Sequence, residues 1–169
     1  MPHVLETAAE VPSHGALAEA LSMRGKLMDL TQASYQAALL PEDTGNLPAN
    51  IRAALACRMA RINQQPGLTQ HYGDLLAGYG DAADPYQLAM PGKTPPADEA
   101  RLAAIIGYVD LVTERPKDAS EETINALRSA GIDEPDIVRL AGLVAFVNYQ
   151  LRVAAVLSVM GKNNEPSDT

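Results

Sequence analysis

The 169-residue chain has few of the residues on which several protein classes depend. Its single cysteine, Cys57, excludes an intrachain disulfide, a Cys-x-x-Cys redox pair and a zinc ribbon. Three scattered histidines form no metal-binding motif, so we expect no metal and no other cofactor. Tryptophan is absent and aromatic residues make up only 4% of the chain, so a core here has to be built mainly from aliphatic side chains.

Basic residues are also scarce. Thirteen lysines and arginines against twenty-one acids leave a net charge of −8. Nucleic acids and anionic membranes attract clusters of Lys and Arg, so we expect neither as a partner. The first residues lack the basic start and apolar run of a signal peptide, and no uninterrupted apolar run approaches eighteen residues. We therefore expect a cytoplasmic protein with no membrane-spanning segment.

Alanine and leucine are abundant, and apolar residues recur at spacings of three and four rather than in alternation. This pattern favours an all-α fold. The spacing predicts about seven helices in two halves, with an internal loop at 80–97 and a disordered tail at 162–169. The expected helices cover 15–40 (broken near 23–25), 48–62, 68–79, 98–115, 120–131 and 133–161.

The last expected helix is apolar almost all round, which is unusual for a helix at the surface of a small domain. One small domain can hardly cover such a helix. We therefore expect it to be central, either within the domain or at the subunit interface of a homo-oligomer.

Several segments in a fixed order carry a family resemblance. They are 51–63 in the first half and 111–116, 126–132, 136–138 and 145–154 in the second. Together they resemble the carboxymuconolactone decarboxylase and alkylhydroperoxidase (AhpD-like) superfamily over residues 15–161, and more closely its peroxidase-related branch. The resemblance implies one all-α AhpD-like domain that forms homo-oligomers. In active members it also implies a Cys-x-x-Cys pair that reduces hydroperoxides, assisted by a Glu and a His.

The positions of that site can be transferred one by one. The two family cysteines fall on Gln65 and Leu68, the glutamate on Ala53, and the histidine on His71, or on Tyr72 if the spacing is longer. A thiol peroxidase needs one thiolate to attack the peroxide and a second thiol to resolve the sulfenic acid. Glutamine and leucine can do neither, so we expect the inherited peroxidase chemistry to be absent.

Cys57 and His71 each allow two interpretations. Cys57 is either a small buried residue or the thiol of a one-cysteine peroxidase. His71 is either an ordinary histidine near a helix start or part of a pocket with Cys57 and Tyr72, suited to a small, partly apolar ligand. Asp74 stands three residues after His71, but two such groups without a third make no metal site.

Asn148 and Arg152 share one face of the apolar last helix. A buried charge needs a partner, and Asp110 in the other long helix of this half is the candidate. We expect these three residues to form a polar clasp that fixes helix register or subunit pairing; a ligand-binding role is the alternative.

Two functions remain open. The first is a redox-silent AhpD-like protein, a ligand-binding or structural subunit that binds a small molecule or works beside a cysteine-containing paralogue. The alternative is an enzyme of the superfamily, either a peroxidase-related oxidoreductase or a carboxymuconolactone-decarboxylase-like lyase that uses His71. The residues at 53, 65 and 68 favour the first, and only His71 favours the second.

Overall fold

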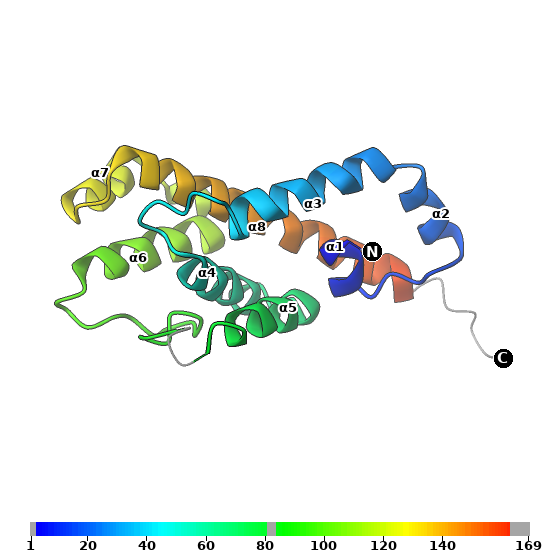
Figure 1. Cartoon of the computed structure of the whole chain (residues 1–169), viewed down its shortest axis with the longest axis horizontal. Coiled ribbons are helices and arrows are strands. Elements are labelled where there is room, and N and C mark those ends of the chain that lie inside the picture. The colour runs from blue at the N-terminus through cyan, green and yellow to red at the C-terminus, as the bar shows by residue number, and fades with distance from the viewer. Residues whose placement is uncertain (1–2, 81–83, 163–169) are drawn as a thin grey trace.

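A computed structural model describes residues 3–80 and 84–162, and this part of the chain is entirely helical, with turns and loops between the helices. The prediction of an all-α fold is therefore confirmed. The helices are α1 (Val4–Ala8), α2 (Ala16–Ser22), α3 (Gly25–Leu39), α4 (Ala49–Ile62), α5 (Pro66–Ala77), α6 (Ala100–Glu114), the short 3-10 helix η2 (Pro116–Asp118), α7 (Glu121–Ser129) and α8 (Glu134–Lys162) (Figure 1).

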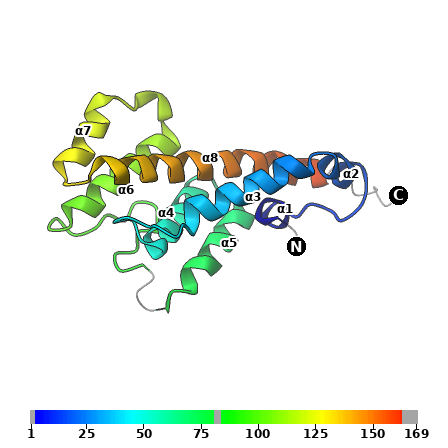
Figure 2. The same cartoon turned by 45° about the horizontal axis from the view of Figure 1, so that its top comes forward.

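The 29-residue helix α8 runs along the length of the molecule and packs against α1, α3, α4, α6 and α7 (Figure 2). Its inner face buries a continuous apolar row that includes Leu140, Val144, Val147, Leu151 and Ala154. The expectation of a central last helix is thus correct within one chain. By length and composition alone α8 could also cross a membrane, yet 44% of its most apolar window is buried inside the protein.

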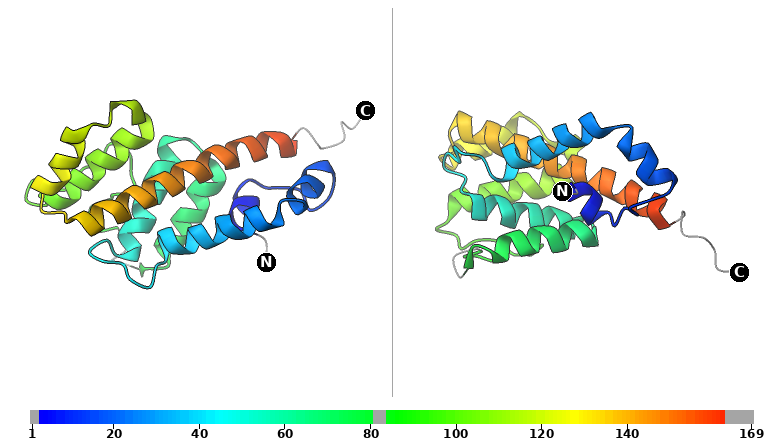
Figure 3. Two further views of the ribbon diagram at one scale, coloured as in Figure 1. Left: turned by 90° about the horizontal axis from the view of Figure 1, so that it is seen from above. Right: turned by 45° about the vertical axis from the view of Figure 1, so that its right-hand side comes forward.

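Helices α4 and α5 form a tight hairpin below α8 (Figure 3). Every residue of α4 from 51 to 60 is buried, and the small side chains of Ala53, Ala54 and Ala56 allow its neighbours to approach closely. Small residues contribute little apolar area themselves, but they let α4 serve as the centre of the core.

Two arginines on α4 are almost completely buried and hold the loops on either side. Arg52 donates hydrogen bonds to the carbonyls of Ala38, Thr44 and Leu47, which fixes the connection between α3 and α4. Arg58 donates to the carbonyls of Leu88, Met90 and Lys93 in the connection between α5 and α6. Residues 84–97 of the expected 80–97 loop therefore wrap around one buried guanidinium.

Several expected boundaries agree with the structure, and two short elements, α1 and η2, were missed. The break near 23–25 separates α2 from α3. The short helix α1 was not expected, because five residues are too few to show a hydrophobic period. Of the expected disordered tail only Lys162 is described, as the last residue of α8; positions 163–169 lie outside the described residues.

Candidate functional site

The position of the family's thiol pair lies at the start of α5. Gln65 is the N-cap of this helix, and its side-chain Oε1 accepts a hydrogen bond from the Leu68 backbone N–H at 2.7 Å. A cysteine here would have its thiolate stabilised by the helix dipole. In this chain a neutral amide oxygen takes that place, and Leu68 is fully buried in the core.

The other transferred positions lack polar chemistry as well. Ala53 is fully buried on α4 and has no group that could move a proton. Cys57, one turn further along α4, is also fully buried, and its Sγ lies 3.9 Å from the Thr69 carbonyl oxygen. Burial raises the pKa of the Cys57 thiol above its ordinary value, which favours the unreactive thiol form.

The unexpected helix α1 covers the start of α5. The Ala8 carbonyl lies so close to Gly67 that a Cβ built on Gly67 would stand 1.7 Å from its oxygen. Only glycine permits this contact. The end of α5 at which the family's thiols would stand is thus packed against the N-terminal segment of the same chain.

His71 is half-buried, and its ring Nε2 lies 2.9 Å from the hydroxyl oxygen of Tyr35 on α3. Burial lowers the pKa of His71, an effect that the charge of Asp74 partly offsets, and burial raises the pKa of Tyr35 to about 12. The pair is therefore neutral at physiological pH. It makes a hydrogen-bonded contact between α3 and α5.

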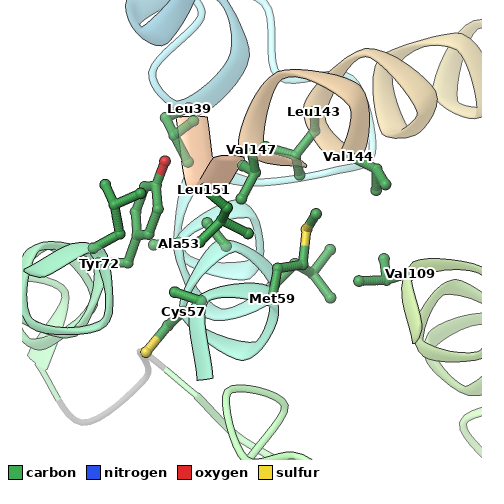
Figure 4. Packing of buried hydrophobic residues seen from close by; sticks show 14 of the residues in the cluster. Leu39, Ala53, Cys57, Met59, Tyr72, Val109, Leu143, Val144, Val147 and Leu151 are labelled. Atoms are coloured by element: carbon green, nitrogen blue, oxygen red, sulfur yellow. The ribbon is translucent and has the colours of Figure 1, made fainter. Parts of the chain in front are cut away.

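Cys57, His71 and Tyr72 do not surround a common cavity. Tyr72 is fully buried and donates from its hydroxyl to the side-chain oxygen of Gln150 on α8. In Figure 4 the Tyr72 ring reaches past Ala53 toward Leu39, whereas the Cys57 sulfur points the opposite way. Neither of the two largest pockets described below is lined by any of the three expected residues.

A pocket of about 540 Å³ lies beside Gln65, between α1, α5 and α8. Gln65 and Gly67 form one wall, and the cationic side chains of Arg152 and Lys162 contribute to another. Gln64, also in the wall, adopts a left-handed backbone conformation with φ of 53°. A second pocket, of about 470 Å³ and more apolar, lies between α3 and α8.

The expected clasp of Asp110, Asn148 and Arg152 is wrong. Asp110 forms a two-pronged ion pair with Arg58, with Nε–Oδ1 and Nη2–Oδ2 both at 2.6 Å. Asn148 is buried, whereas Arg152 is exposed and lines the pocket between α1, α5 and α8. The two residues are four apart in sequence, yet the packing of α8 separates their environments.

Sequence reasoning missed Arg58, Tyr35 and Gln150, which make the main buried polar contacts around this site. The available signal was the presence of two arginines, six residues apart, within an otherwise apolar α4 stripe. Such cations have to be paired when buried. Within the described ranges, no three His, Cys, Asp or Glu side chains gather as a metal ion would require.

Comparisons with known proteins bear on the fold. The structure is similar to the crystal structure of an uncharacterized peroxidase-related protein from Silicibacter sp. TM1040, with a TM-score of 0.68, 21% sequence identity and coverage of 90% of each chain. No family model and no curated protein matches the sequence. The fold is thus that of a peroxidase-related protein, and at this identity the likeness extends to the fold alone.

Proposed function

We propose that this chain is a cytoplasmic, redox-silent relative of the AhpD-like peroxidases that works as a structural or ligand-binding subunit of a homo-oligomer. One observation carries the proposal: the place of the thiol pair is occupied by a helix cap, Gln65, and a core residue, Leu68, and α1 packs over it. In this chain that place is a packed helix start.

The ligand-binding form of the proposal is supported by the pocket beside α5. Its Arg152 and Lys162 side chains face the same space as the amides of Gln64 and Gln65. This combination suits a small polar molecule better than a hydroperoxide with an apolar tail.

The enzyme alternative receives little support. His71 is hydrogen-bonded to Tyr35 and lies outside the lining of both large pockets. A general base has to reach the proton that it removes, directly or through one water.

Hydroperoxide consumption in the presence of dithiothreitol tests the proposal, with the intact protein compared with Cys57→Ser. We expect no turnover above the buffer rate in either protein, because the only thiol is buried and its pKa is raised. Turnover that disappears in Cys57→Ser would instead make this a one-cysteine peroxidase. Turnover present in both and lost in His71→Gln would establish the enzyme alternative.

A further inference from the structure

The outer face of α8 carries a regular exposed stripe. Seven exposed residues follow one another at alternating spacings of four and three, and we call them the α8 stripe: Val138, Gly142, Ala145, Tyr149, Arg152, Val156 and Val159. Apolar residues that repeat every 3.5 positions form the contact seam of paired helices. Val138, Val156 and Val159 are 70%, 58% and 61% exposed, so these parts of the seam face solvent. Tyr149 is the member that contacts another helix, because its hydroxyl lies 3.2 Å from that of Thr31 on α3.

Charge is depleted on this face. Between residues 140 and 161, Arg152 is the one charged residue of α8, although the chain as a whole has 34 charged residues. The core of a protein–protein interface shows the same depletion.

Helix α3 extends the face. It lies beside α8 (Figure 3), and its exposed residues Leu27, Leu30, Ser34 and Ala37 follow the same alternation of three and four; we call them the α3 stripe. Hollows between the two helices are lined by Gly142 and by Ala145, both members of the α8 stripe. The two stripes therefore form a grooved surface in which Arg152 is the one charged stripe residue, while Arg52 and the ion pair of Asp43 and Arg139 line the hollow beside Gly142.

The α8 stripe is complementary to itself when reversed. If a second α8 runs antiparallel with the two-fold axis at the level of Val147, Ala145 lies level with the partner's Tyr149 and Gly142 with the partner's Arg152. Val138 then lies level with the partner's Val156. The Ala145–Tyr149 and Gly142–Arg152 pairs, each repeated on the other side of the axis, set a small residue against a large one. Close packing of two helices requires such pairs.

The surface is also large enough. If all of their exposed surface were buried, the two stripes would contribute on the order of 800 Å², the usual contribution of one partner to a stable interface. A lipid bilayer is a poorer occupant, because Arg152 would sit near the middle of the hydrocarbon region and a 3.5-residue repeat would have no counterpart there.

We propose that the α8 stripe pairs antiparallel with that of a second copy of this chain, with the α3 stripes packing alongside to complete a four-helix interface. Tyr149 fills the hollow at the partner's Ala145. The aliphatic stem of Arg152 covers the partner's Gly142, and its guanidinium stays at the pocket between α1, α5 and α8, at the edge of the interface. The pairing rests on the proposed homo-oligomer but not on the loss of thiol chemistry, so the peroxidase assay and the test below can fail separately.

The first test measures molar mass by sedimentation equilibrium for the intact protein and for Ala145→Arg. We expect a dimer, or a larger even assembly, whose mass halves in Ala145→Arg because each introduced arginine would place an unpaired charge against the partner's Tyr149 in the buried centre of the interface. Ala103→Arg makes the same change at an exposed site of α6 and should leave the mass unchanged. Helical circular dichroism should be equal in all three proteins, since both substituted sites are exposed.

A second test addresses the register. Ala145→Tyr and Tyr149→Ala should each raise the dissociation constant at least tenfold, and the double variant should recover most of the loss because every layer again holds one tyrosine and one alanine. A monomeric intact protein, an Ala145→Arg protein of undiminished mass, or a double variant weaker than both single ones would overturn the pairing. So would flotation of the intact protein with phosphatidylcholine vesicles.

Discussion

Arg52 and Arg58 are the least expected residues of this core. Their exposed fractions are only 2% and 1%, in the middle of the most buried helix. Burial lowers the pKa of Arg52, with a further contribution from the charge of Arg139, while the charges of Asp136 and Asp43 act in the opposite direction. Each guanidinium donates hydrogen bonds to three backbone carbonyls. Each arginine therefore fixes the backbone of its loop at three points.

Replacing Arg58 by Met should be strongly destabilising. The change removes the ion pair to Asp110 and leaves the carbonyls of the 84–97 loop without their donor. Loss of one partner of a fully buried pair costs about 3–5 kcal/mol of unfolding free energy. Because 30% of the Asp110 side chain is exposed, we expect a loss near the lower end of that range, measurable by urea denaturation.

Arg128→Met is the matched control for Arg58→Met. Arg128 also makes a two-pronged ion pair, with Glu134, but both side chains are about half exposed or more. Exposed pairs contribute about 1 kcal/mol or less. Equal losses in the two variants would mean that Arg58 does not organise the loop.

Among the elements, the contact of α1 with α5 has the strictest requirement. Gly67 stands in the first turn of α5, and a single methyl group there would collide with the Ala8 backbone. Backbone atoms cannot rotate away as a side chain can, so the two helices would have to separate.

We therefore expect Gly67→Ala to lower the melting temperature, with a cost of about 1–3 kcal/mol as in other overpacked sites. Hydrogen exchange of residues 4–8 should become faster because α1 detaches. Gly73→Ala is the control on the same helix: a Cβ there meets nothing within 4 Å, so the better helix former should stabilise by about 0.5–1 kcal/mol. If the two variants behave alike, α1 does not depend on the glycine contact.

At the scale of the whole molecule, the net charge of −8 opposes self-association. Two copies repel each other over distances that added salt screens, whereas Arg152 is the one charged residue of the two stripes. Raising NaCl from about 0.02 to 0.3 M should therefore tighten the dimer. Sedimentation at both concentrations measures this, and a dissociation constant that rises with salt would point to an interface held by ion pairs instead.

The sequence alone determined the helical class, most helix positions and the absence of a Cys-x-x-Cys pair. Helix periods and turn residues are local properties, and the absence of a second cysteine needs no structure to be recognised. The start of α5 lies two residues before the expected 68, because Pro66 takes the first helical position instead of interrupting the chain.

Tertiary structure decided the rest. Asp110 could be assigned to Arg152 from sequence because both lie on apolar helices, but its actual partner, Arg58, is 52 residues away on α4. The contact of Ala8 with Gly67 also joins residues that are distant in sequence. The sequence of α8 is apolar almost all round, so it does not indicate which face of the helix points outward. The side of such a helix that stays exposed depends on where other helices pack against it. Hydrophobic periodicity carries no information about helices that are distant along the chain.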